Sequence, residues 1–283
     1  MFNNSLKKEA FRIHEETLKR YNASYDLMSK MCEQLYEERI KSVEVIKKVE
    51  KVINSIANTP KEFDTKFGEI NQALKKFMET EKYAKEAYEA SVKAGVNIFS
   101  GAATGMGIAT MAPTAMMSIA TTFGTATTGT AISALSGAAA QKAAVAWIGR
   151  TFVGFAVKEG AGMAVGQAFL ALAGPVGWGI TAGSTALSLV SLTNKNKKIA
   201  DDAINEAKEI AKAREALDEV AEKVSGLKSR TIILLNDMNS IIDQLIRFMN
   251  VDYNTIEEND KLFLGTILNN TLTLSALLNE TIQ

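Results

Sequence analysis

The sequence contains one cysteine, one histidine and three prolines in 283 residues. The single cysteine excludes an internal disulfide, and one cysteine with one histidine excludes a zinc site built from several such ligands. The scarcity of proline argues against a loop-rich β protein and favours long helices. The 32 basic and 32 acidic side chains cancel, so the chain lacks the electrostatic signature of a nucleic-acid-binding protein.

Residues suited to catalysis or cofactor binding are also scarce. No GxxxxGK[ST] phosphate-binding loop occurs, and the glycines of residues 160–166 have the wrong spacing for a dinucleotide loop. His14 and Cys32 both fall on a predicted apolar stripe of a helix, where a structural role is expected. We therefore expect no enzyme activity, no catalytic residue, no metal site and no cofactor.

Charge is distributed very unevenly along the chain. Only four side chains between residues 94 and 194 are charged, namely Lys142, Arg150, Lys158 and Glu159, and 16 of the 19 glycines lie between Gly95 and Gly183. Two highly charged arms flank this apolar centre. The sequence thus predicts an N-terminal helical hairpin over residues 1–95, an apolar insert over 96–193, and a long helix with a final helix over 194–283.

A seam of apolar residues runs along the first arm in alternating steps of three and four residues, which is the spacing of a coiled coil. Its fourteen positions, eleven of them apolar or aromatic, are Phe11, His14, Leu18, Tyr21, Tyr25, Met28, Cys32, Leu35, Arg39, Ser42, Ile46, Val49, Ile53 and Ile56. At Arg39 and Ser42 we expect the stripe to shift to the neighbouring Ile40 and Val43. The segment 59–62, Thr-Pro-Lys-Glu, predicts the start of a second, antiparallel helix.

The last arm carries a stronger seam. Between Ile199 and Phe248, thirteen of fifteen positions at the same spacing are apolar. Turn residues follow at 250–254, and a final helix is expected from about Thr255. These helices predict an all-α fold: an elongated antiparallel bundle with a coiled-coil stalk and a central apolar helical insert rich in glycine and alanine.

The centre has two runs without charge, residues 94–141 and 160–194, each long enough to cross a bilayer, which takes about 20 apolar residues. Three GxxxG pairs favour close helix–helix packing: Gly101/Gly105, Gly162/Gly166 and Gly179/Gly183. Aromatic and basic side chains suited to a lipid interface lie between the runs or within the second: Lys142, Trp147, Arg150, Phe152, Phe155, Lys158 and Trp178. Ordinary packing against the helical arms is the alternative role for these side chains.

The order long helix, helix, apolar insert, long helix and final helix resembles the α-helical pore-forming toxins of the cytolysin A and Hbl/Nhe type. The resemblance covers the whole chain as a layout and includes no family-specific motif. The stretch 168–179, AFLALAGPVGWG, is similar to the membrane-insertion region of apolipoprotein-L-like proteins. These resemblances imply a helical carrier with a membrane-entering head, in a toxin or in an antiviral defence effector.

We therefore expect a membrane-inserting, pore-forming or permeabilising protein with a lipid membrane as its partner, acting as a homo-oligomer. A protein partner or inhibitor remains open, and nucleic acid is not expected. The start of the sequence, residues 1–8, lacks the apolar region of a signal peptide. A cytoplasmic soluble form and a membrane-inserted form are thus expected. The alternatives are a membrane-anchored coiled-coil scaffold and a soluble partner-binding bundle, such as an antitoxin or adaptor.

Overall fold

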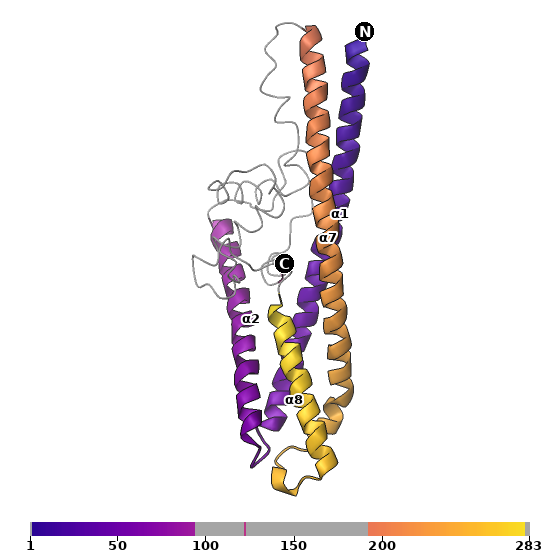
Figure 1. Ribbon diagram of the computed structural model, residues 1–283. Helices are drawn as coiled ribbons and strands as arrows, with labels where there is room; N and C mark the ends of the chain where they lie inside the picture. Colours follow the sequence, from indigo (N-terminus) through magenta and orange to yellow (C-terminus); the bar gives the residue numbers. More distant parts are fainter. Residues whose placement is uncertain (1, 94–121, 123–191, 281–283) are drawn as a thin grey trace. The chain divides into compact units, whose positions relative to one another are not determined.

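The structure, a computed structural model, describes residues 2–93, 122 and 192–280, and this part of the chain is predominantly helical without a β-strand (Figure 1). The elements are α1 (Phe2–Ile53), α2 (Lys61–Lys93), α7 (Leu192–Ile246), the 3-10 helix η2 (Tyr253–Thr255) and α8 (Glu258–Asn279). The all-α prediction is confirmed for the described residues.

The described residues belong to two compact units, each built from both arms of the sequence. The first unit contains residues 2–30, 88–93 and 192–222, and the second contains 31–87, 122 and 223–280. In the first unit, Ala10 of α1 packs with Ala200 and Ala203 of α7, and Phe11 and Ile204 lie against them. Alanine at such a contact lets two helix backbones approach closely.

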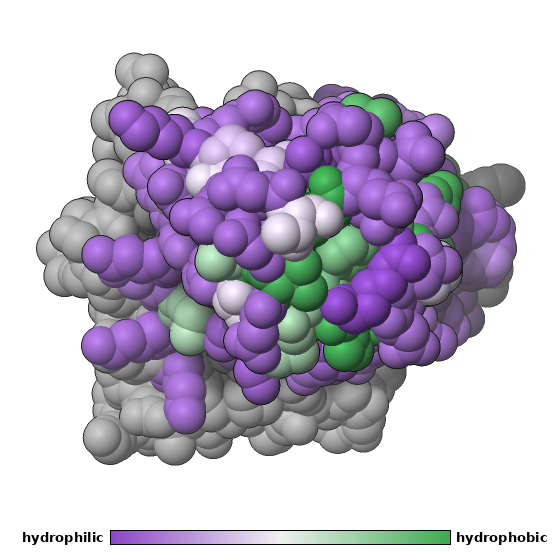
Figure 2. Space-filling model, turned by 90° about the horizontal axis from the view of Figure 1, so that it is seen from below, coloured by the Kyte–Doolittle hydropathy of each residue, from purple (hydrophilic) through white to green (hydrophobic). Residues whose placement is uncertain are grey.

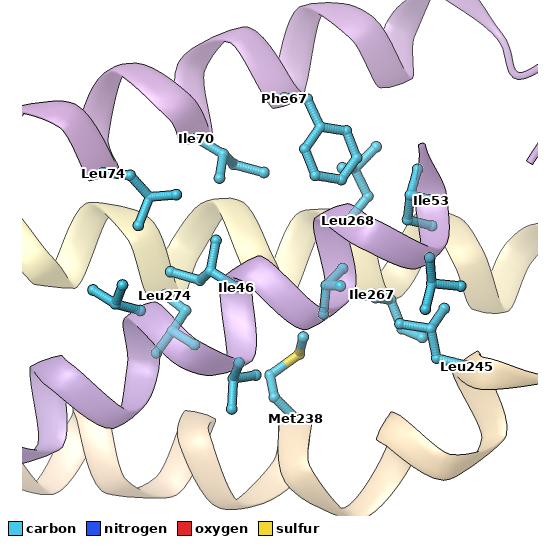
Figure 3. Packing of buried hydrophobic residues seen from close by; sticks show 14 of the residues in the cluster. Ile46, Ile53, Phe67, Ile70, Leu74, Met238, Leu245, Ile267, Leu268 and Leu274 are labelled. Carbon is cyan, nitrogen blue, oxygen red and sulfur yellow. The ribbon is translucent and has the colours of Figure 1, made fainter. Parts of the chain in front are cut away.

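The core of the second unit takes side chains from α1, α2, α7 and α8. Figure 3 shows apolar side chains of these helices pointing toward one another. Fully or almost fully buried members include Ile46 of α1, Ile70 of α2, Met238 of α7, and Ile267 and Leu274 of α8. None of these helices could bury its apolar stripe alone, so this shared core is what stabilises the unit.

Contacts between the helices define their directions within the second unit. α1 and α2 run antiparallel, because a short turn joins them and the Tyr36 hydroxyl reaches Glu81. α1 and α7 instead run parallel. Lys228 donates a hydrogen bond to Gln34, and the backbone N–H of Asn250 donates one to Ser55. The bonded residues are 194 and 195 positions apart in the sequence, and a nearly constant separation along the two segments means that they run in the same direction. An antiparallel arrangement therefore describes the α1/α2 hairpin but not the pairing of the two long helices.

The predicted shift of the first seam away from Arg39 and Ser42 is wrong. Both side chains are fully buried, while Val43 is buried as well and Ile40 is partly buried. The buried stripe therefore widens at this level instead of moving. It can do so because three other helices surround α1 here, and a single partner helix would cover only a narrow seam.

The charged side chains that the structure describes in the second unit, other than Arg39, are exposed or only partly buried. Figure 2 shows the molecule from below. The described residues on this face are mainly hydrophilic, with apolar side chains gathered near its centre. Among the large apolar residues that do reach the surface of the unit are Ile246, Met249 and Leu262. Most of the other large apolar residues that α7 and α8 contribute to this unit are buried or partly buried.

The turn after α1 and the turn after α7 are joined to each other. The backbone N–H of Ala57 donates to the Val251 carbonyl, and that of Tyr253 donates to the Ala57 carbonyl, at 2.9 Å each. The Asn58 side chain adds a 2.9 Å hydrogen bond to the Asp252 carboxylate. We call Ala57, Asn58, Val251, Asp252 and Tyr253 the turn lock. It fixes the parallel register of α1 and α7 at this end of the unit.

Candidate functional site

The most unusual side chain of the second unit is Arg39, a cation on the apolar seam of α1. It is fully buried, and its Nη2 donates a 2.7 Å hydrogen bond to the backbone carbonyl of Glu280, the residue directly after α8. Burial lowers the pKa of Arg39 to about 10, and the nearby Cys32 and Glu280 act in the opposite direction. The guanidinium therefore stays charged at neutral pH.

Glu280 joins Arg39 to a second cation. Its carboxylate Oε1 forms a short ion pair with Nη2 of Arg230 on α7, at the edge of the unit where both side chains are partly exposed. We call Cys32, Arg39, Arg230 and Glu280 the Arg39 cluster. It connects α1, α7 and the end of α8 through polar groups placed next to an aliphatic core.

Cys32 lies one heptad before Arg39 on the same seam. Its side chain is fully buried, as its seam position predicts, and burial raises the pKa of its thiol strongly. A thiol must ionise to act as a nucleophile, so this environment suppresses its reactivity. Cys32 therefore has the properties of a packed side chain.

Tyr36 lies on the next turn of α1 and links it to α2. Its hydroxyl donates a 2.7 Å hydrogen bond to Oε1 of Glu81, and its ring packs on Phe77 with the centroids 6.3 Å apart. Burial, followed by the contact with Glu81, raises the pKa of the Tyr36 hydroxyl. This pair fixes the position of α2 beside α1 without offering a group for acid–base chemistry near neutral pH.

The polar contacts of the Arg39 cluster hold helices in position. A buried ion gains little net stability but strongly disfavours arrangements that leave it without its partners. Within the described ranges 2–93, 122 and 192–280, no group of three His, Cys, Asp or Glu side chains could hold a metal ion. The cluster therefore specifies how α1, α7 and α8 meet.

His14, the single histidine of the sequence, lies in the first unit. Its side chain is buried, with 6% of its surface exposed. This position on α1 agrees with the structural role expected from the sequence. His14 and Cys32 belong to different units.

α8 is a helix that, within the described part of the chain, is long and apolar enough by length and composition to cross a membrane. Its apolar side chains have another use, however. Leu264, Ile267, Leu268, Leu274 and Leu278 are all buried in the core of the second unit. We therefore interpret α8 as a core helix.

The side chains predicted to contact lipid all lie outside the described residues. They are Lys142, Trp147, Arg150, Phe152, Phe155, Lys158 and Trp178. The same holds for the predicted helix-packing glycines Gly101, Gly105, Gly162, Gly166, Gly179 and Gly183. These assignments stay predictions.

Sequence reasoning missed the Arg39 cluster, although one signal was present. The alternating steps of three and four residues land directly on Arg39 and Ser42, so the seam itself placed them in the core. Residue type alone argued for a shift, because arginine is rarely buried without a partner. Its partner lies 241 residues further along the chain, which no local pattern could reveal.

No protein-family model, no curated protein and no solved structure matches the chain.

Proposed function

We propose that this protein is a membrane-permeabilising effector in which the apolar centre enters lipid and the helical arms carry it. One observation carries the proposal: about 100 consecutive residues hold only four charges, between two arms that contain all the others. A segment of this length and composition suits two or more bilayer crossings. The proposal includes the finer architecture, an elongated bundle with a central helical insert.

The packing of the arms supports this division of labour. The apolar side chains of α1, α2, α7 and α8 in the second unit fill a common core, so they are not available to lipid. In the second unit, these helices therefore bury their apolar stripes without a membrane. A hydrophobic surface that needs lipid has to come from residues 94–191.

The full-length protein tests the proposal directly in a vesicle assay. We expect it to release a trapped dye from anionic or neutral phospholipid vesicles and to float with them in a density gradient. Release should rise steeply with protein concentration if several copies assemble into one pore. Basic side chains near the interface predict stronger release from anionic than from neutral vesicles.

Two results would contradict permeabilisation. Flotation without dye release would indicate a membrane-anchored scaffold. Neither flotation nor release from either vesicle type would indicate a helical bundle whose partner is another protein.

A further inference from the structure

Three contacts converge where α8 ends. The Asn279 side-chain amide donates a 2.8 Å hydrogen bond to the backbone carbonyl of Ala73 on α2. The next residue, Glu280, accepts from Arg39 on α1 through its backbone carbonyl and pairs with Arg230 on α7 through its carboxylate. Two consecutive residues thus tie α8 to the three other helices of the second unit.

We propose that Asn279 and Glu280 form a latch, which closes the second unit at this end and whose release opens the core around Cys32 without unfolding the rest of the unit. We call these two residues the α8 latch. The inference goes beyond the proposed function and stands without it, because it concerns only residues of the second unit.

The kind of contact that closes the unit differs between its two ends. At the far end, the turn lock relies on backbone hydrogen bonds between Ala57, Val251 and Tyr253. At the latch, every contact depends on a side chain: two are part-buried hydrogen bonds, and the third is the ion pair of Arg230 with Glu280, whose side chains are 58% and 40% exposed. Water can replace such contacts, so this end should open first.

Arg39 makes opening at the latch easier than opening in the aliphatic core. In the closed unit its charge is held away from water, and the Glu280 carbonyl is one of its partners. When the latch opens, water hydrates the guanidinium, and this hydration offsets part of the free energy lost with the contacts. A buried leucine at this position would have no such compensation.

Cys32 is a built-in reporter of this opening. It is the only cysteine in the chain, it is fully buried, and it lies seven residues before Arg39 on the same stripe of α1. A maleimide or disulfide reagent can reach the thiol only after local opening. Under native conditions the labelling rate is then proportional to the population of the open state.

The test compares labelling of Cys32 in the full-length protein and in Glu280→Ala, without vesicles. The ion pair of Arg247 with Asp260 provides a matched control, because it joins the residue directly after α7 to α8 and has similar side-chain exposures of 56% and 33%. We expect Glu280→Ala to label about threefold faster than the unmodified protein, because it removes the exposed ion pair but keeps the Glu280 carbonyl that binds Arg39. Asp260→Ala should label at the unmodified rate.

A second variant removes more of the latch. A chain that ends at Leu278 lacks all three contacts and should label faster than Glu280→Ala. Urea unfolding of each variant provides the global stability for comparison. Unchanged labelling in Glu280→Ala would overturn the proposal. Equal acceleration in Glu280→Ala and Asp260→Ala would also overturn it, since the effect would then be global.

Discussion

At Arg39, burial and charge oppose each other, and the hydrogen bond to the Glu280 carbonyl offsets part of the cost of burial. The side chain is fully enclosed, yet it remains charged because its pKa of about 10 is still well above neutrality. The Glu280 carbonyl places an opposite partial charge next to it, and the Glu280 carboxylate, which pairs with Arg230, adds a full negative charge nearby. The buried charge of Arg39 therefore favours the one arrangement of the helices that supplies its partners.

Cys32 gives the unit a predictable response to alkaline pH. Burial raises the pKa of this thiol above its ordinary value of 9.0. In the unfolded chain the thiol ionises at about pH 9, whereas in the folded unit it remains protonated. The unfolded state then binds fewer protons, so the free energy of unfolding falls as the pH rises.

We expect the free energy of unfolding to decrease between pH 8 and 10, with a slope that approaches about 1.4 kcal/mol per pH unit from this group. Urea titrations at several pH values measure the slope, and Cys32→Ala should flatten it. Tyr36, whose pKa is also raised, contributes in the same direction above its ordinary value of 10.0. Arg39 acts in the opposite direction only above about pH 10. An equal slope in Cys32→Ala would contradict the assignment.

At the scale of elements, the turns decide how the helices are paired. Asn58 and Asn250 both have positive φ angles, 56° and 61°, in the two turns that meet at the turn lock. Asparagine tolerates this left-handed conformation better than most residues. The Asn58 side chain also donates a hydrogen bond to the Asp252 carboxylate. The backbone N–H of Asn254 and this side chain together hold the pKa of Asp252 below its ordinary value.

Substitutions at these two asparagines should separate backbone conformation from side-chain bonding. Alanine at either position should lower the free energy of unfolding by about 1–2 kcal/mol, because it is strained in the left-handed region. Asn250→Gly should restore most of this stability. Asn58→Gly should restore less, since it still lacks the hydrogen bond to Asp252. Urea denaturation measures all four variants, and identical values for alanine and glycine would contradict a conformational role.

For the whole molecule, the contrast between arms and centre is the main feature. The described helices place their charges on the surface, with Arg39 as an exception, and most of their apolar side chains in a core. Residues 94–194 have too few charges to do the same over their length. This difference underlies the proposed function, in which the two parts meet different solvents.

A single acidic substitution in the centre should distinguish the two environments. Leu172→Asp places a carboxylate in the second uncharged run, at a cost of about 3 kcal/mol for insertion into lipid. We expect it to reduce dye release from vesicles while the urea unfolding of the second unit stays unchanged. Ile233→Asp is the control, because Ile233 is 63% exposed on α7 and should tolerate the charge. Equal dye release by both variants would contradict a lipid-facing role for this run.

Local periodicity was sufficient to predict the helices and most of their buried positions. The seam of the first arm identified Cys32, Leu35, Ile46 and Val49, all of which are buried. Helix ends were close as well: α2 begins at Lys61, directly after the proline expected to start it, and the turn before α8 lies where asparagine and aspartate cluster. These features depend on neighbours three or four residues away, which a sequence displays directly.

Tertiary structure alone decided which helices run parallel, how the two turns lock, and what holds Arg39. The sequence by itself determined the all-α fold class, since apolar spacing selects helices and leaves each with a stripe to bury. It could not determine the partner of each stripe, because several pairings bury similar apolar area. That choice depends on single polar contacts between distant residues, such as Arg39 with Glu280 and Asn58 with Asp252, which form only once the helices have packed.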